Sequence, residues 1–385
     1  MTTATLSPPE LVRYSRHVIL PEVGLAGQQR LKGSRVLIVG CGGLGSPVAL
    51  YLAAAGVGHL GLVDFDHVDA SNLQRQILHS TSAIGQSKLD SAEARLLNLN
   101  PYVRVERYET RLVAANALEI IQGYDVVVDG TDNFSTRYLV NDACVILGVP
   151  NAYGSIYRFE GQASVFATKD GPCYRCLFRQ PPPAGSVPNC AEGGVLGVLP
   201  GLVGTIQATE AIKLLLGIGR SLIGELLLVD ALDMEFRRLK VRKDPECPAC
   251  GTREIRELQD LEVECAVPEV KKGWDISVLE LAERRRAGRD LFLLDVREPH
   301  EWEIGRIEGA ELVPLGELLR SLDRVPRDRD VVVYCKGGAR SAQAAHLLGE
   351  AGYLRVEHLL GGILAWWGAE IDPSLPAQDR LTPGS

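Results

Sequence analysis

The sequence predicts an α/β protein built from two units, a larger one followed by a smaller one. In the first half of the chain, strand-like apolar runs alternate with helix-like segments, and a glycine-rich turn follows the first run. A second and shorter series of such runs begins near Trp274. Continuous apolar strands separated by helices are typical of a parallel sheet that is covered on both faces.

The larger unit begins with a strand predicted over Ser34–Gly40, which is rich in β-branched residues and meets glycines. A helix of small residues is expected from about Leu44 to Ala55. Further strands are predicted to end at Asp66 and Gly130. A strand, a glycine turn and a helix in this order indicate a Rossmann-like arrangement.

The smaller unit has strands predicted over Leu291–Val296 and Asp330–Cys335, followed by a helix from Ser341 to about Leu348. The residues between the two units are mixed, charged and weakly periodic, which is typical of a linker. We therefore expect three segments, a first domain, a linker and a second domain: 1–250, 251–273 and 274–385.

The composition of the 385 residues, with 46% hydrophobic and 23% charged, is typical of a soluble globular protein. A net charge of −8 argues against nucleic-acid binding, which usually needs a basic face. The N-terminus does not have the pattern of a signal peptide. The most apolar segment, Gly193–Gly219, contains Glu210 and Lys213, so we interpret it as a buried helix and expect a cytoplasmic protein with no membrane partner.

A G-x-G-x-x-G pattern stands at the predicted strand-to-helix turn and is formed by Gly40, Gly42 and Gly45, with Gly43 inside it. Such glycines allow a tight turn in which a phosphate approaches backbone N–H groups at a helix N-terminus. Asp64, near the end of the next strand, is placed to accept hydrogen bonds from a ribose. Alone, the pattern favours a nicotinamide or flavin enzyme.

The following segment favours a different nucleotide. Asn72, Arg75 and Lys88 come after the second strand, and Asp132 and Asn133 come after the third. Cations and an acidic residue at strand ends suit a triphosphate with magnesium, which a hydride-transfer site does not need. Individually, the two cations could be surface charges and Asp132 a helix cap; the combination supports ATP.

Five blocks in the first 250 residues resemble the molybdopterin-synthase and thiamine-biosynthesis adenylyltransferases, which are simple relatives of the ubiquitin-activating enzymes. The blocks are RYSRHVILPEVG, VLIVGCGGLG, DFDHVDASNLQRQ, DGTDN and SIYRFEGQASVF. The resemblance implies a homodimer that uses ATP to adenylate the C-terminal carboxylate of a small ubiquitin-like carrier protein ending in Gly-Gly.

The same resemblance implies roles for single residues at matching positions. Gly43 would contact the nucleotide and Asp64 its ribose. The phosphates would be bound by Asn72, Arg75 and Lys88, and magnesium would be held by Asp132. Arg16, in RYSRH, would reach the ATP of the partner subunit.

Two C-x-x-C pairs are formed by Cys173 with Cys176 and by Cys247 with Cys250. Each pair can offer two thiolates to one tetrahedral zinc ion, which would then be structural because no coordination position stays open. Redox-active disulfides are the alternative, although neither pair opens a thioredoxin-like helix. The family resemblance also implies zinc at these positions.

Cys190 follows the proline-rich stretch PPPAGSVP and has no C-x-x-C partner. Its position resembles that of a loop cysteine with which related enzymes hold the activated carrier or a sulfur intermediate. A core cysteine is the alternative.

Cys335 begins the stretch CKGGARS, between a predicted strand and a predicted helix. Backbone N–H groups, the helix N-terminus and Arg340 would together stabilise a thiolate, a persulfide or another anion there. With LLDVRE, EWEIGRIEGA and LLGGILAW, this stretch resembles a rhodanese domain. Its loop is one residue shorter than that of related phosphatases, which favours sulfur over phosphate, and Arg306 stands where rhodaneses commonly have histidine.

The combination of the two domains predicts a carrier thiocarboxylate as the product, because adenylation makes a carboxylate electrophilic and a persulfide is a sulfur nucleophile. Such carriers serve molybdopterin, thiamine, cysteine or tRNA thiolation pathways. A cysteine desulfurase or thiosulfate could be the upstream sulfur donor. Three alternatives stay open: a nicotinamide-dependent dehydrogenase, an activator whose product is a stable Cys190 thioester, and a non-catalytic scaffold that docks carriers.

Overall fold

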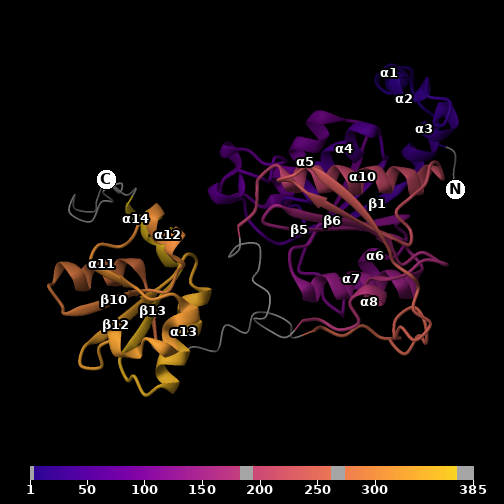
Figure 1. Cartoon of the computed structure of the whole chain (residues 1–385). Coiled ribbons are helices and arrows are strands. Elements are labelled where there is room, and N and C mark those ends of the chain that lie inside the picture. The colour runs from indigo at the N-terminus through magenta and orange to yellow at the C-terminus, as the bar shows by residue number, and fades with distance from the viewer. Residues whose placement is uncertain (1–3, 183–193, 262–273, 371–385) are drawn as a thin grey trace. The chain divides into compact units, whose positions relative to one another are not determined.

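The structure is a computed structural model that describes residues 4–182, 194–261 and 274–370. The chain divides into two compact units, Met1–Glu264 and Cys265–Ser385 (Figure 1). Each unit contains one sheet with helices on both faces, so the predicted α/β fold class is confirmed.

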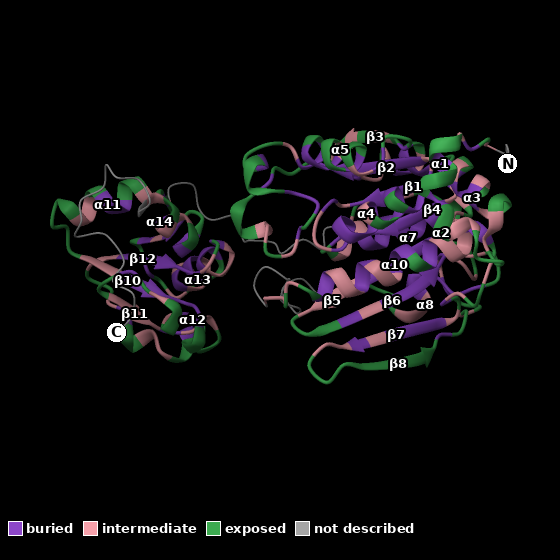
Figure 2. Cartoon of the chain, turned by 90° about the horizontal axis from the view of Figure 1, so that it is seen from above, coloured by how far each residue is buried: buried purple, intermediate pink, exposed green. Residues whose placement is uncertain are grey.

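The first unit is built on an eight-stranded sheet with the order β3-β2-β1-β4-β5-β6-β7-β8. The first five strands in this order pair in parallel, and the remaining pairs are antiparallel. The strands are β1 (Arg35–Val39), β2 (His59–Asp64), β3 (Arg104–Glu109), β4 (Val126–Asp129), β5 (Asn151–Tyr157), β6 (Glu160–Phe166), β7 (Glu225–Asp230) and β8 (Glu235–Lys240). The antiparallel half was not predicted from the sequence, and its outer strand β8 is exposed (Figure 2).

Helices cover both faces of this sheet because side chains of β1 alternate between two cores. Val36 and Ile38 pack with α3, α4, α5 and α10, whereas Leu37 and Val39 pack with α6 and α7. The helices of this unit are α1 (Pro8–Arg13), α2 (Ser15–Val18), α3 (Gly24–Gly33), α4 (Gly45–Ala55), α5 (Lys88–Leu99), α6 (Ala117–Ile121), α7 (Phe134–Leu147), α8 (Tyr174–Leu177) and α10 (Leu199–Leu216), with 3-10 turns η1 (Ala70–Asn72) and η2 (Thr81–Ala83).

Several predicted elements agree closely with the structure. The strand predicted over Ser34–Gly40 is β1, and the apolar segment Gly193–Gly219 contains the buried helix α10. The second strand ends at Asp64, two residues before the predicted end at Asp66. Across the described ranges, no helix combines the length and apolar character that a membrane span requires.

The second unit contains a five-stranded parallel sheet with the order β11-β10-β12-β13-β9. One face packs on α11 and α14, and the other packs on α13 and η3. The strands are β9 (Asp275–Ile276), β10 (Leu291–Asp295), β11 (Ala310–Leu312), β12 (Asp330–Tyr334) and β13 (Val356–Leu359). The helices are α11 (Val278–Arg286), α12 (Pro299–Ile304), α13 (Ala339–Glu350) and α14 (Gly362–Glu370), with η3 (Leu315–Arg320) and η4 (Leu322–Arg324).

Residues 251–261, which belong to the predicted linker, lie against the first unit. Ile255, Leu258 and Leu261 pack on three of its apolar clusters. The backbone N–H of Ala114 donates a hydrogen bond of 2.8 Å to Oδ1 of Asp260. This segment therefore extends the packed part of the first unit beyond the second cysteine pair.

Candidate functional sites

The first candidate site lies where β2, β1 and β4 end side by side, at the carboxyl edge of the parallel strands. The chain continues from β1 toward β2 on one side and returns to β4 on the other, so this edge is a topological switch point. Open α/β sheets bind their ligands in the crevice at such a point. The glycine pattern, Asp64 and the turn after Asp129 all lie at this edge.

The glycine turn is shaped by close backbone approaches that exclude side chains. A Cβ added to Gly45 would lie 1.9 Å from the carbonyl oxygen of Gly40, so α4 can begin there only with glycine. Gly40 has φ +92°, and an added Cβ would lie 3.0 Å from the oxygen of Gly130, at the end of β4. The predicted turn and its helix N-terminus are therefore present, with two strand ends in contact.

Asp64 holds this turn through backbone hydrogen bonds. Its Oδ2 accepts a bond of 2.7 Å from the N–H of Cys41, and its Oδ1 accepts one of 2.9 Å from the N–H of Asp66. Each carboxylate oxygen can accept a further hydrogen bond. Asp64 is thus both a support of the glycine turn and a possible acceptor for ribose hydroxyls.

The structure brings two residues of the NLQRQ stretch to the glycine turn. The Cγ of Arg75 lies 3.5 Å from the place that a Cβ of Gly43 would take, and Nε2 of Gln76 lies 3.7 Å from the corresponding place at Gly42. Gln76 donates a hydrogen bond of 2.6 Å to Oδ1 of Asn72. The aliphatic stem of Arg75 and the amide of Gln76 therefore border the turn, while the guanidinium of Arg75 donates to the carbonyl oxygen of Ser71. Gln76 was not singled out from the sequence.

Lys88 begins α5, and its side chain is 7% exposed. Its Nζ lies 2.9 Å from Oδ2 of Asp66, whose side chain is half exposed. The ion pair fixes the direction of the lysine, while the exposed carboxylate can be replaced as a partner by a phosphate. The sequence pattern did not indicate this pairing.

Asp132 and Asn133 follow β4 and differ in how their side chains are used. Oδ1 of Asn133 accepts a hydrogen bond of 2.9 Å from the N–H of Thr136, so Asn133 is the N-cap of α7. The possible cap function considered for Asp132 is therefore taken by its neighbour. Asp132 is exposed and has no hydrogen bond or ion pair to any part of the chain that the structure describes. Its carboxylate is available to a ligand.

The turn that carries Asp132 is held by hydrogen bonds to the buried side chain of Asp129. Oδ1 of Asp129 accepts hydrogen bonds from the N–H and hydroxyl of Thr131 at 3.0 and 2.5 Å. Burial raises the pKa of Asp129, and Arg137, whose Nε lies 3.7 Å from its Oδ2, opposes that effect. These buried groups fix the backbone on which Asp132 stands.

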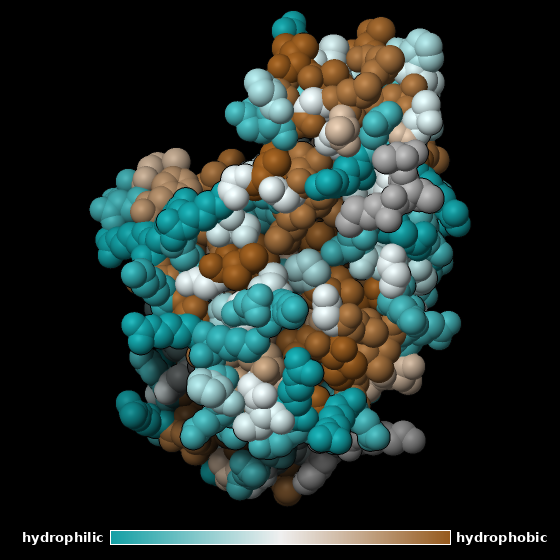
Figure 3. All heavy atoms as spheres, turned by 90° about the vertical axis from the view of Figure 1, so that its right-hand side faces the viewer, coloured by the Kyte–Doolittle hydropathy of each residue, from teal (hydrophilic) through white to brown (hydrophobic). Residues whose placement is uncertain are grey.

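Arg16 lies in α2 and is exposed, and its side chain makes no ion pair within the described ranges. Helices α1–α3 and the segment between α2 and α3 expose large apolar side chains, and hydrophobic residues gather at the top of the face in Figure 3. These exposed residues are Leu11, Val12, Ile19, Leu20 and Leu25. A basic residue within an exposed apolar surface suits a protein interface.

The four cysteines of the C-x-x-C pairs meet at one point. All four sulfur atoms lie within 4.8 Å of one another, with Cys173 and Cys247 at 3.5 Å and Cys176 and Cys250 at 3.4 Å. Four thiolates at about 2.3 Å from a tetrahedral zinc ion would stand about 3.8 Å apart. The backbone N–H of Asp244 also donates to Cys176 at 3.4 Å. The cluster is compatible with zinc.

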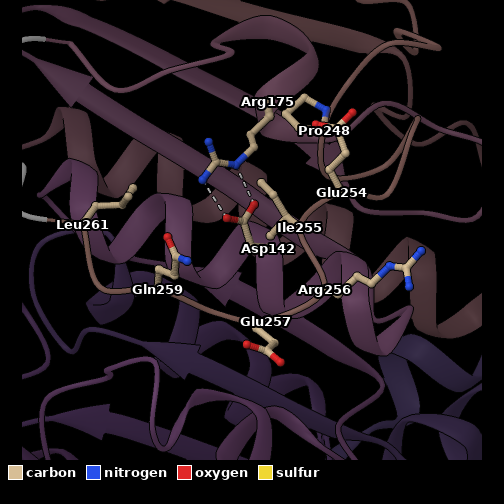
Figure 4. Close-up of a pocket in the computed structure, with 9 residues that line it drawn as sticks. All are labelled: Asp142, Arg175, Pro248, Glu254, Ile255, Arg256, Glu257, Gln259 and Leu261. Atoms are coloured by element: carbon tan, nitrogen blue, oxygen red, sulfur yellow. Dashed lines mark hydrogen bonds and ion pairs between the residues drawn. The ribbon is translucent and has the colours of Figure 1, made fainter.

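A cavity of about 350 Å³ lies near the second cysteine pair and contains none of the predicted site residues (Figure 4). Residues 254–257 border it from one side, and Asp142 with Arg175 borders it from the other. Arg175 donates hydrogen bonds of 2.8 and 2.7 Å to the two oxygens of Asp142. The charges of this pair compensate each other, which is typical of a structural contact.

The second unit presents Cys335 directly after β12, where the residue is 1% exposed. The N–H of Gly338 donates to its sulfur at 3.1 Å, and Gly338 has φ +105°. Gly362, at the start of α14, has space only for hydrogen because an added Cβ would lie 2.4 Å from the carbonyl oxygen of Cys335. The loop is therefore a tight cradle at the N-termini of α13 and α14.

Arg340 has a partner that the sequence did not indicate. Its guanidinium donates two hydrogen bonds, of 2.6 and 2.8 Å, to the carboxylate of Glu301 in α12. Burial raises the pKa of Glu301, but the hydrogen bonds from Arg340 and from the N–H of Glu298 outweigh it and leave that pKa below its ordinary value. The charge of Arg340 is thus compensated by Glu301, whereas the N–H of Gly338 donates directly to the sulfur of Cys335.

Glu301 is itself held in place by a second buried pair. Arg297 and Asp295 lie 2.6 Å apart, and Arg297 also donates a hydrogen bond of 3.0 Å to the carbonyl oxygen of Glu301. Arg306, which stands where histidine was expected, lies over the ring of Trp302 at 5.1 Å. Cys190 lies outside the described residues.

Two family models match the chain. The model described as the ThiF family matches residues 14–249, and the model described as a rhodanese-like domain matches residues 277–369. The predicted resemblance is confirmed in both units.

Among curated proteins, the probable adenylyltransferase/sulfurtransferase MoeZ of Mycobacterium tuberculosis is 50% identical over 376 residues, covering 94% of each chain. The adenylyltransferase and sulfurtransferase MOCS3 of Sus scrofa is 45% identical, covering 97% of this chain and 89% of its own. The sulfur carrier protein adenylyltransferase of Thermus thermophilus is 56% identical, covering 67% of this chain and 97% of its own.

Among solved structures, Escherichia coli MccB with MccA-N7isoASN matches 62% of this chain and 75% of its own, with 22% identity and a TM-score of 0.57. This likeness supports the fold of the first unit.

Proposed function

Because this chain belongs to the ThiF family and carries a rhodanese-like domain, we propose that it adenylates the C-terminal carboxylate of a small ubiquitin-like sulfur-carrier protein and converts it into a thiocarboxylate. The chain is an adenylyltransferase and sulfurtransferase. The observation that carries the proposal is that relatives with both activities in their names align along nearly the whole chain.

In the first step, an oxygen of the carrier carboxylate attacks the α-phosphorus of ATP, and pyrophosphate leaves. This reaction requires no nucleophile from the enzyme, so positioning and charge compensation provide the catalysis. Gly42 and Gly43 would receive the phosphates on backbone N–H groups, and Arg75 and Lys88 would oppose the negative charge. The proximity of Arg75 to Gly43 supports this assignment.

Magnesium, when bound, would neutralise charge on the triphosphate and on the departing pyrophosphate. Asp132 is our candidate ligand because it is exposed at the end of β4, beside the glycine turn, and has no other partner among the residues described here. Asn133 contributes by fixing the first turn of α7, and its cap bond keeps the backbone of Asp132 in place.

In the second step, the outer sulfur of a Cys335 persulfide attacks the carbonyl carbon of the adenylate, and AMP leaves with the electron pair of the broken C–O bond. The carrier is then joined to Cys335 through an acyl disulfide. A second thiolate attacks the Cys335 sulfur, which releases the carrier thiocarboxylate and forms a protein disulfide. An external dithiol reduces that disulfide. Cys190 is our candidate for the second thiolate.

Carrier-dependent exchange of pyrophosphate into ATP tests the adenylation step. A dehydrogenase or a non-catalytic scaffold would give no exchange, whereas the proposed enzyme gives exchange with a carrier ending in Gly-Gly and none with a carrier that lacks this end. The sulfur donor would be thiosulfate or a cysteine desulfurase.

The homodimer that the family resemblance implies is also part of our proposal, and it provides a prediction for Arg16. If Arg16 acts on the partner's ATP, an Arg16→Ala subunit mixed with an Asp132→Ala subunit forms a dimer with one intact site, because each variant supplies the group that the other lacks. We expect each variant alone to be inactive in pyrophosphate exchange and the mixture to regain part of the activity. Failure to regain activity, with subunit mixing verified by native mass spectrometry, would place Arg16 in its own chain's site or in a structural function.

For the cysteine cluster we expect one zinc ion per chain, measured by elemental analysis of freshly purified, reduced protein. Removing it with a chelator should lower the melting temperature, because the metal joins residues 173–176 to residues 247–250 and a closed four-thiolate site stabilises the fold. Exchange activity of the chains that stay folded should persist. Zinc-free protein with an unchanged melting temperature would contradict the assignment.

A further inference from the structure

A buried histidine that the sequence pattern did not single out contacts the glycine turn. His79 lies between η1 and α5 and is 8% exposed. Its Nε2 is 3.1 Å from the carbonyl oxygen of Cys41, and its Nδ1 is 3.0 Å from the hydroxyl of Ser91 in α5. Both ring nitrogens therefore have one partner each.

The partners determine the tautomer of the ring. A carbonyl oxygen can only accept, so Nε2 carries hydrogen and donates to Cys41, while Nδ1 accepts from the hydroxyl of Ser91. Burial lowers the pKa of His79. The hydrogen bond to the carbonyl of Cys41 raises this pKa, and the nearby charge of Lys88 lowers it further. His79 is thus a neutral donor whose direction Ser91 sets.

The hydrogen bond from His79 fixes a peptide group that faces the nucleotide edge. In a planar trans peptide, the C=O of Cys41 and the N–H of Gly42 point in opposite directions. With the carbonyl held toward His79, the N–H of Gly42 points away from it. The preceding N–H, of Cys41 itself, is held by Asp64 at 2.7 Å.

The N–H groups of Gly42 and Gly43 donate to no other group within the ranges that the structure describes. Free N–H groups at a helix N-terminus bind phosphate, whereas a carbonyl oxygen turned toward a phosphate repels it. The orientation of the Cys41–Gly42 peptide therefore decides whether this part of the turn attracts or repels the triphosphate.

We propose that His79 is a positioning residue for the adenylation reaction: by holding the carbonyl of Cys41, it keeps the N–H of Gly42 directed at the phosphates of ATP. This inference rests on the proposed function, in which the glycine turn binds ATP. In this inference His79 acts through the glycine turn and touches neither ATP nor the carrier protein.

The test compares His79→Phe, which keeps an aromatic ring without a donor, with His79→Gln, which returns an N–H donor. His59→Phe is the matched control, because His59 is also 8% exposed. It begins β2, at the end of the strand opposite to Asp64 and the glycine turn, and it pairs with Glu106 at 2.7 Å. The probes are α,β-methylene-ATP with Mg²⁺ and, separately, adenosine. Titration calorimetry measures the first, and displacement of a fluorescent adenosine derivative measures the second.

For His79→Phe we expect the Kd for α,β-methylene-ATP to rise about tenfold, the effect of losing one hydrogen bond to a charged group. The Kd for adenosine should stay within about a factor of two, since only the phosphates sense Gly42. His79→Gln should recover most of the lost affinity, and His59→Phe should bind both probes like the wild type.

Unchanged binding of the analogue by folded His79→Phe, or an equal loss for both probes, would overturn the inference. If His79→Phe does not fold, Ser91→Ala replaces it: we expect a smaller loss of the same selectivity, and wild-type binding by this variant would overturn the inference as well. A wild-type chain that does not bind the analogue would instead contradict the proposed function.

Discussion

The Asp132→Ala variant is expected to lose carrier-dependent pyrophosphate exchange by roughly a hundredfold or more, as is typical when a group that stabilises transition-state charge is removed. Asp132 is exposed beside the glycine turn, and its carboxylate has no partner in the described parts of the chain. We therefore expect the melting temperature to stay close to that of the wild type. The lost activity would then report on the reaction and not on folding.

The control for this variant is Glu119→Ala, which removes an exposed carboxylate from α6. It should retain full exchange, because α6 lies away from the phosphate-binding turn in sequence and contributes no residue to it. Asn133→Ala makes a useful comparison, since loss of a helix cap costs about 1 kcal/mol of stability. Exchange by folded Asp132→Ala at the wild-type rate would remove Asp132 from the magnesium site.

The Cys335→Ala variant is expected to keep pyrophosphate exchange and to lose both thiosulfate sulfurtransfer and carrier thiocarboxylate. Adenylation needs no enzyme thiol, because the carrier's own carboxylate is the nucleophile. Sulfur transfer needs the persulfide, which the cradle of Gly338 and the N-terminus of α13 would stabilise. Cys144→Ala is the control, because Cys144 lies on the buried face of α7 in the core of the first unit and should affect neither activity.

Cys190→Ala should also keep exchange, with a smaller loss of thiocarboxylate, because an external thiol can replace the second thiolate of the sulfur-transfer step. The loss should therefore decrease as the concentration of added dithiol rises. Product formation that does not depend on Cys190 at any dithiol concentration would remove this cysteine from the mechanism.

Features that depend on neighbouring residues could be predicted from the sequence. The glycine turn after β1 was predictable because a strand, a tight turn and a helix N-terminus leave a local pattern in the sequence. Gly45 is part of that pattern because its position has no room for a side chain. The two C-x-x-C pairs were recognisable for the same reason, since each half of the cluster is local. The family resemblance then allowed distant pieces to be joined.

Pairings between distant residues left no such pattern. Glu301 and Arg340 are separated by 39 positions, and nothing in the sequence of α12 distinguishes Glu301 from the acidic residues around it. The contact of His79 with Cys41 likewise depends on the path of the chain between β2 and α5. The antiparallel strands were not predicted; for β8 the reason is that all of its residues are exposed and most are charged, so it does not resemble a strand of a buried sheet.

The central claim is that one chain uses ATP to turn a carrier carboxylate into a thiocarboxylate. The most direct test is the intact mass of a carrier ending in Gly-Gly after incubation with the full chain, Mg²⁺–ATP, thiosulfate and a dithiol. We predict that one oxygen of the carrier is replaced by sulfur, only when ATP is present and Cys335 is intact. A carrier of unchanged mass, a stable thioester on Cys190 as the end product, or thiocarboxylate formed at the normal rate by Cys335→Ala without free sulfide would contradict the account.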